Sequence, residues 1–281
     1  MSNTQKPQYP PLEAGSPFEL RANRSQAIPE SDVRAALATG SMGFLHSFTT
    51  GSTVDGPGIR VVAWTAGCQF RCLYCHNPDT WNMGNGIPVK LDKAIAELRK
   101  YRHGLKVMSG GFTLSGGEPL MQDRFGVRLL RAAQEMGIHT ALDTNGNFGN
   151  RLTDEELRAA DLVLLDIKCW DQERHRRLTG MEIAPVLDFA RRLAHQRRSV
   201  WLRFVLVPGL TDDIEDISQI AGFAAGLGNV ERVDVLPFHQ LGRYKWRELG
   251  LTYTLDKFLP PTSGQIESAR QLFRSEGLNA P

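Results

Sequence analysis

Several features that would place a chain in a special class are scarce in this sequence. Its 281 residues contain only four cysteines, and 33 basic against 31 acidic residues leave a net charge of +2. Four cysteines do not make the disulfide framework of a small secreted domain. So small a net charge gives no sign of nucleic-acid binding. The apolar stretches are short and interrupted by charge, so none approaches the roughly 20 apolar residues of a membrane-spanning helix.

The amino terminus also lacks the charged and then apolar pattern of a secretory signal. We therefore expect a cytoplasmic protein in a reducing compartment, without membrane or nucleic-acid partners, that acts as a monomer. Residues 1–40 are rich in proline and polar side chains and are expected to form a mobile extension, with one short helix at residues 31–38. Residues 41–281 are expected to form one domain.

From residue 43 onward, apolar runs typical of β-strands alternate with amphipathic helical stretches. Strands that are apolar nearly throughout and are separated by helices indicate a parallel sheet covered on both faces. Six strands are too few for a closed eight-stranded barrel, so a partial barrel and a doubly wound sheet both fit. The predicted strands are residues 60–65, 112–114, 139–143, 162–167, 200–207 and 232–236, and the predicted helices are residues 91–101, 124–136, 186–195, 214–225 and 264–274.

Polar residues gather at the carboxyl ends of these predicted strands. The sequences SGGEP (115–119), DTNG (143–146) and DIK (166–168) each close a strand, Arg203 lies on the fifth strand, and His239 follows the sixth. In parallel α/β proteins the carboxyl ends of the strands meet at one edge, where loops converge on a ligand. The sequence therefore predicts a large ligand site at this edge.

The stretch GCQFRCLYCHN, residues 67–77, concentrates three cysteines, Cys68, Cys72 and Cys75. A disulfide would leave the third thiol unpaired, and a structural zinc ion would need His76 or the distant Cys169 as its fourth ligand. An iron–sulfur cluster usually takes four thiolates, so three would leave one iron open to a substrate or cofactor. The chemistry therefore favours a cluster over zinc and leaves Cys169 as a buried bystander.

The spacing C-x3-C-x2-C after a first strand resembles the signature of the radical S-adenosylmethionine (SAM) enzymes. The resemblance covers about residues 43–275 and is closest to the activases of glycyl radical enzymes, in particular those that act on pyruvate formate-lyase. It implies a partial (β/α)6 barrel of the radical SAM type. The further motifs, in the order found in those activases, are TVDGPGIR, SGGEPL, HTALDTNG, DLVLLDIK, WLRFVLVPGLTDD and GNVERVDVLPFHQLGRYKW.

The same resemblance implies a chemistry and its partners. One [4Fe-4S] cluster, bound by Cys68, Cys72 and Cys75, would cleave SAM to a 5′-deoxyadenosyl radical that abstracts a glycine Cα hydrogen. The implied partner is a glycyl radical enzyme, foremost pyruvate formate-lyase, and the implied electron donor is a flavodoxin-like protein. A different target of the same radical chemistry remains an alternative, and a zinc-stabilised binding module without catalysis is the alternative from another class.

The resemblance also assigns roles to individual residues. A monovalent cation shared with the SAM carboxylate is implied at Asp143, Thr144, Leu164 and Asp166, where the leucine replaces a methionine of the family. The substrate peptide is implied to meet Asp55, Gly56 and Arg203. The implied SAM contacts are Tyr74, Cys75, His76, Gly116, Gly117, Asp166, Ile167, Lys168 and His239, with Glu118 in support.

Simpler structural roles stand beside these assignments. Asp166 and Lys168 alternate along one strand and would therefore point to the same face, where they could pair with each other. Tyr74 could be a packing ring, His239 a structural histidine, and Asp143 the cap of a turn. The structure is needed to show which groups these side chains meet.

Overall fold

The structure, a computed structural model, describes residues 30–281. Residues 1–29, which hold most of the predicted extension, lie outside the described residues. The short helix predicted next to them is observed as α1 (Glu30–Thr39). It ends against the helix α3 (Asp123–Glu135), where the Arg128 guanidinium donates a hydrogen bond to the Thr39 carbonyl at 3.0 Å.

One mixed sheet of eight strands organises the described part of the chain, in the order β3-β1-β2-β4-β5-β6-β7-β8. Its six last strands in this order run parallel to one another, whereas β1 is antiparallel to both β2 and β3. The predicted partial (β/α)6 barrel is confirmed. The strands are β1 (Met42–Ser52), β2 (Arg60–Thr65), β3 (Ile87–Lys90), β4 (Gly111–Gly116), β5 (His139–Thr144), β6 (Leu162–Asp166), β7 (Ser199–Leu206) and β8 (Val230–Pro237).

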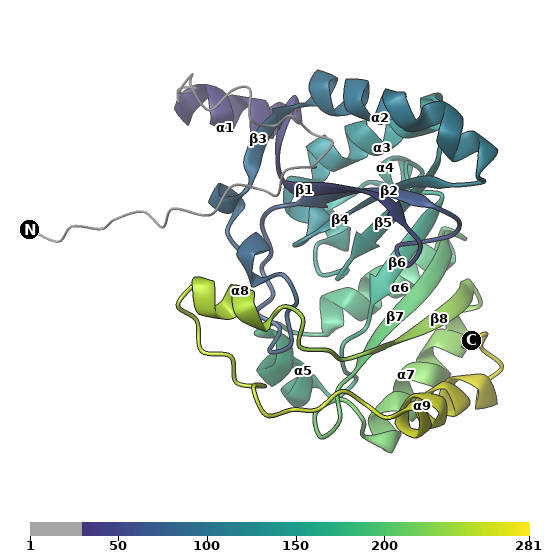
Figure 1. The fold of residues 1–281 in the computed structure, drawn as a ribbon. Helices are drawn as coiled ribbons and strands as arrows, with labels where there is room; N and C mark the ends of the chain where they lie inside the picture. Colours follow the sequence, from purple (N-terminus) through teal and green to yellow (C-terminus); the bar gives the residue numbers. More distant parts are fainter. Residues whose placement is uncertain (1–29) are drawn as a thin grey trace, which may run out of the picture.

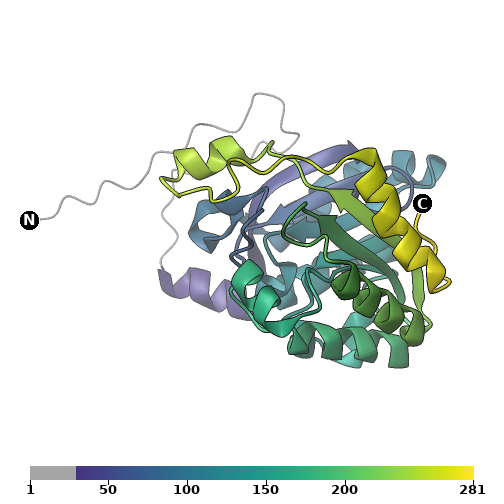
Figure 2. The same cartoon turned by 90° about the horizontal axis from the view of Figure 1, so that it is seen from below.

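Helices follow the parallel strands and lie along the outer side of the curved sheet (Figures 1 and 2). Each of the five predicted helices after residue 43 is present, and three short ones, α4, α5 and α8, were not predicted. The helices are α2 (Leu91–Val107), α3 (Asp123–Glu135), α4 (Asp154–Leu157), α5 (Gln172–Thr179), α6 (Ala184–His195), α7 (Ile214–Leu227), α8 (Arg243–Glu248) and α9 (Ser263–Ser275), with 3-10 turns at Pro78–Thr80, Met83–Asn85, Pro119–Gln122 and Gly149–Arg151.

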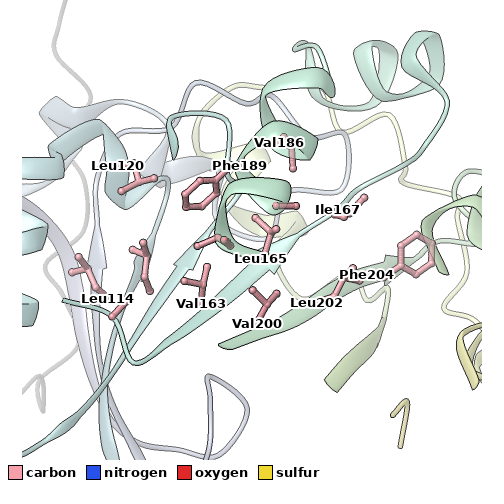
Figure 3. Close-up of a cluster of buried hydrophobic side chains, with 14 of the residues drawn as sticks. Leu114, Leu120, Val163, Leu165, Ile167, Val186, Phe189, Val200, Leu202 and Phe204 are labelled. Atoms are coloured by element: carbon pink, nitrogen blue, oxygen red, sulfur yellow. The ribbon is translucent and has the colours of Figure 1, made fainter. Parts of the chain in front are cut away.

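Alternation along the strands gives the sheet two different faces. Val163, Leu165 and Ile167 of the β6 region point outward and pack with Leu202 of β7 and Phe189 of α6 (Figure 3). The alternate positions point inward. On this inner face a small apolar cluster of Ala141, Leu162, Leu164 and Trp201 lies below the polar residues at the strand ends. The outer core therefore fixes the strands, and the inner face is left for charged side chains.

The two antiparallel strands at the sheet edge are the main difference from the sequence-based expectation. β1 mixes polar residues with glycine in HSFTTGS, and β3 has only four residues, one of them Pro88. Proline is tolerated in a sheet mainly on an edge strand, which is the position β3 takes. Neither segment has the apolar run by which the parallel strands were recognised. Across residues 30–281 the helices are too short or too polar for any of them to span a membrane.

Candidate active site

The loop that carries the three cysteines follows β2 and is fixed on two sides by main-chain hydrogen bonds. Gly67 N donates to Thr80 O at 2.6 Å, which closes the loop on the segment after it. On the other side Arg71 N donates to Thr179 O at 2.7 Å, and the next turn bonds to Leu178 in the same way. These two sets of bonds fix the backbone that carries the cysteines.

All three thiols are withdrawn from water. Cys72 is buried, and Cys68 and Cys75 are half-buried. Burial raises the pKa of Cys72 to about 12 and that of Cys75 to about 11, and it raises the pKa of Cys68 further. A bound metal centre removes the thiol protons outright, so this donor set suits a group that supplies positive charge to all three sulfurs.

A single-ion site is not what the side chains form. Among residues 30–281, no three side chains of His, Cys, Asp or Glu are grouped as one metal ion would require. The fourth cysteine, Cys169, is buried elsewhere, where its thiol donates to Asp216 Oδ1 at 3.3 Å. Three thiols on one loop, without a fourth ligand side chain beside them in the described part of the chain, fit the iron–sulfur cluster and give no support to the zinc alternative.

The glycines after β4 pack directly against the cysteine loop. Gly117 N donates to Thr65 O at 2.9 Å, and Glu118 N donates to Gly67 O at 2.7 Å. A Cβ on Gly117 would lie 2.3 Å from Gly67 O, and Gly116 has a φ of +130° that side chains rarely adopt. Both glycines are therefore required for backbone to meet backbone. The amide of Gly117 holds this turn to β2 and the amide of Glu118 holds it to the cysteine loop, so a ligand amine would be met by carbonyl oxygens.

Glu118 is the hub between this glycine turn and the loop after β5. Its carboxylate is fully buried and accepts from Leu120 N at 2.9 Å, Thr144 Oγ1 at 2.8 Å and Asn145 N at 2.8 Å. Burial raises the pKa of Glu118 to about 7, although these donors favour the charged form. Glu118 therefore ties together two loops of the site rather than facing a ligand.

Charged groups from three segments meet on the inner face. Arg203 lies 2.9 Å from Asp143 Oδ2 and 3.8 Å from Asp55 Oδ1, and Ser115 Oγ donates to Asp143 at 2.7 Å. Burial lowers the pKa of Arg203, but attraction to Asp143, Asp166 and Asp55 outweighs it, and the net pKa is raised. Burial raises the pKa of Asp55. The loop holding Asp55 and Gly56 thus reaches the same charged group as β5 and β7.

The second charged pair lies at the end of β6. Lys168 Nζ is 2.8 Å from Asp166 Oδ2 and lies 5.8 Å from the centre of the Tyr74 ring. Burial lowers the pKa of Lys168, but Asp166, Tyr74 and Cys72 raise it by more, so the ammonium stays charged. The pairing expected as the simpler role is therefore present. Ile167 points into the outer core (Figure 3), so only its backbone can meet a ligand.

Two histidines and α8 complete the edge. The rings of His76 and His239 stand 4.6 Å apart at 83°, and burial, with His239 and Lys245 nearby, lowers the pKa of His76. Trp246 of α8 donates from Nε1 to the Cys75 carbonyl at 2.9 Å. The predicted SAM contacts His76 and His239 are thus brought together beside the last cysteine.

Only three of the four residues predicted to bind a cation lie along the same face. Asp143 and Leu164 are neighbours in the β5–β6 register, and Asp166 lies two residues further along the same inner face. Thr144 Oγ1, by contrast, is turned to Glu118 and to Gly146 N. The Thr144 side chain is therefore not free for a cation, and this site remains a prediction.

Unpaired polar atoms mark where a ligand is expected. Of the eight side-chain atoms that are buried without a hydrogen-bond partner in the part of the chain that the structure describes, three lie at this site: Gln69 Oε1, Tyr74 Oη and Arg203 Nε. All three belong to the cysteine loop or to the charged inner face. Buried polar groups are normally satisfied, so these orphans fit a polar ligand with both donors and acceptors, as SAM is.

A network that sequence reasoning missed holds the far side of the cysteine loop. Asp79 Oδ2 lies 2.8 Å from His46 Nε2 and 3.1 Å from Lys245 Nζ. Burial raises the pKa of Asp79, but His46 and Lys245 outweigh it, and the net pKa is lowered. His46 lies on the unpredicted β1, and Lys245 lies on the unpredicted α8. The charged Asp79 within the cysteine motif was the one signal that a partner exists.

A partial barrel with three thiols on the loop after its first parallel strand defines a class, that of the radical SAM proteins. The family model described as the Radical SAM superfamily matches residues 62–221. The chain is 41% identical over 242 residues to the pyruvate formate-lyase-activating enzyme of Staphylococcus epidermidis, covering 84% of this chain and 96% of that one.

Two further comparisons agree with this result. The pyruvate formate-lyase 1-activating enzyme of Escherichia coli K12 is 41% identical over 239 residues, covering 84% of this chain and 97% of that one. The crystal structure of a domain of the pyruvate-formate lyase-activating enzyme from Bacteroides vulgatus is 28% identical, with a TM-score of 0.52, over 61% of this chain and 98% of that domain. The chain belongs to the pyruvate formate-lyase-activating enzyme family of the radical SAM superfamily.

Proposed function

We propose that this chain activates pyruvate formate-lyase by generating a glycyl radical on it. The observation that carries the proposal is the trio of Cys68, Cys72 and Cys75, held at the carboxyl edge of a partial barrel, in a chain 41% identical to enzymes named for this activity. When bound, a [4Fe-4S] cluster and SAM supply one electron and a 5′-deoxyadenosyl radical that removes a Cα hydrogen atom from a glycine.

The residues of this chain position those groups and exclude water. Cys68, Cys72 and Cys75 hold the cluster, and the glycine turn fixes their loop. Lys168 and Asp166, now paired at 2.8 Å, offer one positive and one negative group to the oppositely charged groups of SAM. SAM would also meet the other predicted contacts, Tyr74, Cys75, His76, Gly116, Gly117, Ile167 and His239.

Two finer assignments belong to the same proposal. A monovalent cation would be held by Asp143, Asp166 and the carbonyls of Thr144 and Leu164, where hard oxygen ligands are close in register. The glycine-bearing peptide of the partner would meet Asp55, Gly56 and Arg203, and the closeness of Arg203 to Asp55 and Asp143 supports this assignment. The electron would come from a flavodoxin-like protein, and the chain would act as a monomer.

The test is anaerobic incubation of the reconstituted protein with reductant, SAM and pyruvate formate-lyase, followed by electron paramagnetic resonance. We expect a glycyl doublet on the partner and one deoxyadenosine per radical formed. Cys72→Ala serves as the matched variant, because two thiolates cannot hold the cluster, and it should lose iron, colour and SAM cleavage together. A Cys72→Ala protein with full iron and activity would contradict the assignment of the three cysteines.

A further inference from the structure

Exposed apolar side chains are concentrated in one segment that follows the barrel. Of eight large hydrophobic side chains that are exposed in the described residues, four lie between residues 241 and 259, including Leu241 at 70% and Tyr244 at 54%. Single exposed apolar residues are ordinary, but a group of them within a short segment marks an interaction surface. This segment lies beside the active site and is drawn in yellow-green in Figure 1.

Helix α8 has one face turned to the site and one turned to solvent. Trp246 points inward, donating to Cys75 O, and Lys245 Nζ lies 2.8 Å from Asn77 Oδ1. Tyr244 and Arg247 are three residues apart and share the opposite face of the helix, and the exposed Leu241 lies in the turn just before it. The Arg247 side chain is 63% exposed. We name these three residues the α8 rim.

The α8 rim is rigidly joined to the residues predicted to bind SAM. Leu241 N donates to His239 Nδ1 at 3.4 Å, and Gly242 packs so closely on His76 that an added Cβ would lie 2.4 Å from its carbonyl oxygen. Gln240 Nε2 donates to Phe258 O at 2.6 Å and closes the segment into a loop. A partner that rests on the α8 rim is therefore held at a fixed position relative to the site.

We propose that the α8 rim is the docking surface for the folded glycyl radical enzyme whose glycine enters the site. This inference rests on the proposed function. A glycine that reaches the carboxyl edge brings its own protein body against the residues that border that edge, and α8 is such a border. Tyrosine and arginine are the residue types that most often dominate binding energy at interfaces.

The charge of the segment indicates the kind of surface that it fits. Apart from Lys245, which turns inward to Asp79, residues 240–259 carry three cations (Arg243, Arg247 and Lys257) and two carboxylates (Glu248 and Asp256), a net charge of +1. The complementary partner surface is apolar at its centre with acidic residues at its margin.

The test compares an intact partner with a short peptide. L241S/Y244S should raise the KM for intact pyruvate formate-lyase by about tenfold or more, as loss of interface anchors does. With a short peptide containing the radical-site glycine, SAM cleavage should stay within about twofold of wild type, because the peptide does not reach α8. Iron content confirms that the cluster site is intact.

The matched control is V107S/M108S. These side chains are 71% and 48% exposed at the end of α2, which leads into the amino end of β4, at the opposite edge of the sheet. This control should leave the KM for the intact partner unchanged. The same loss in control and rim variant would contradict a specific docking surface.

Other outcomes also overturn the inference. If L241S/Y244S lowers activity equally with peptide and with intact partner, the rim affects the active site itself and not docking. If activity falls with neither, the rim has no role in the reaction. A loss seen only with a flavodoxin as reductant, and absent with dithionite, would assign the rim to the electron carrier. A wild-type dimer that the variant dissociates would assign it to a second copy. Wild-type protein that forms no glycyl radical would instead overturn the proposed function.

Discussion

Replacing Arg203 by alanine should reveal how much the charged inner face depends on one cation. The guanidinium lies 2.9 Å from Asp143 and 3.8 Å from Asp55. The side chains of Arg203 and Asp143 are 12% exposed and that of Asp55 is 7% exposed, so the carboxylates cannot be solvated when the cation is gone. The change leaves two buried acids close together, with their nearest cation removed.

The size of the effect follows from this geometry. Removing one partner of a buried ion pair costs about 3–5 kcal/mol, because the charge left behind is desolvated without compensation. The unfolding free energy of a domain is only about 5–15 kcal/mol, so the Arg203→Ala protein should lose a large share of its stability. Arg203→Lys keeps the charge but can satisfy only one carboxylate well, and we expect a loss of about 1–3 kcal/mol.

The pH dependence gives the sign of the effect. Burial already raises the pKa of Asp55, and attraction to Arg203 lowers it, so without Arg203 the folded-state pKa of Asp55 rises further above its unfolded value. A raised carboxyl pKa favours the folded state at low pH and loses that advantage as pH rises. The deficit of Arg203→Ala against wild type should therefore be larger at about pH 8 than at about pH 5.5.

The assay is urea unfolding of both cluster-loaded proteins, followed anaerobically by circular dichroism at the two pH values. The uncharged denaturant is chosen because guanidinium salt would screen the charges. The double variant Arg203→Ala/Asp143→Asn should recover part of the loss, since one uncompensated charge has been removed. A deficit below about 1 kcal/mol, or one that does not shrink at the lower pH, would refute the reasoning.

Three further predictions follow from the site. Gly117→Ala places a methyl group 2.3 Å from Gly67 O, so it should displace the cysteine loop and lower the iron content after reconstitution. The control Gly222→Ala, at a position with open space around it, should leave the iron content unchanged. Lys168→Met should weaken SAM binding by about tenfold or more while iron content and spectrum persist, and unchanged SAM affinity in calorimetry would contradict the assigned role. Cys169→Ser should keep all iron of the wild type, because its thiol bonds to Asp216 and not to the cluster loop; iron lost in elemental analysis would make Cys169 a ligand.

The sequence predicted correctly those segments whose residues serve mainly one purpose, such as burial in the core or binding of a metal centre. The parallel strands were found because they are apolar nearly throughout, as in β6, whose first four residues, Leu162 to Leu165, are all buried. The cysteine motif was found because few structures need three thiols so close together. β1 and β3 were not predicted, because they contain polar residues and Pro88. Such residues are permitted at the edge of a sheet, and only the strand order shows that these segments lie there.

The hydrogen-bond and ion-pair partners of the site residues could not be predicted from the sequence for a related reason. Glu118 was expected to support SAM, yet its three donors come from residues 120, 144 and 145, and only the fold shows that they converge. Lys245 and His46 meet Asp79 from positions far from it in the chain. A motif shows which chemical groups a site contains. Which of them bind the ligand and which hold the loops in place depends on contacts between residues far apart in the sequence.

The site residues accordingly form two layers, one that holds the loops in place and one that faces the ligand. The groups that hold the loops, Glu118, Asp79 and Trp246, are saturated by the protein's own donors and acceptors. By contrast, Tyr74 Oη and Arg203 Nε on the inner side stay unpaired among the described residues. A site that must hold a charged nucleotide beside a metal cluster needs a scaffold that does not compete for the ligand. Substitutions in the saturated layer should therefore reduce cluster retention, and substitutions in the unpaired layer should reduce SAM affinity.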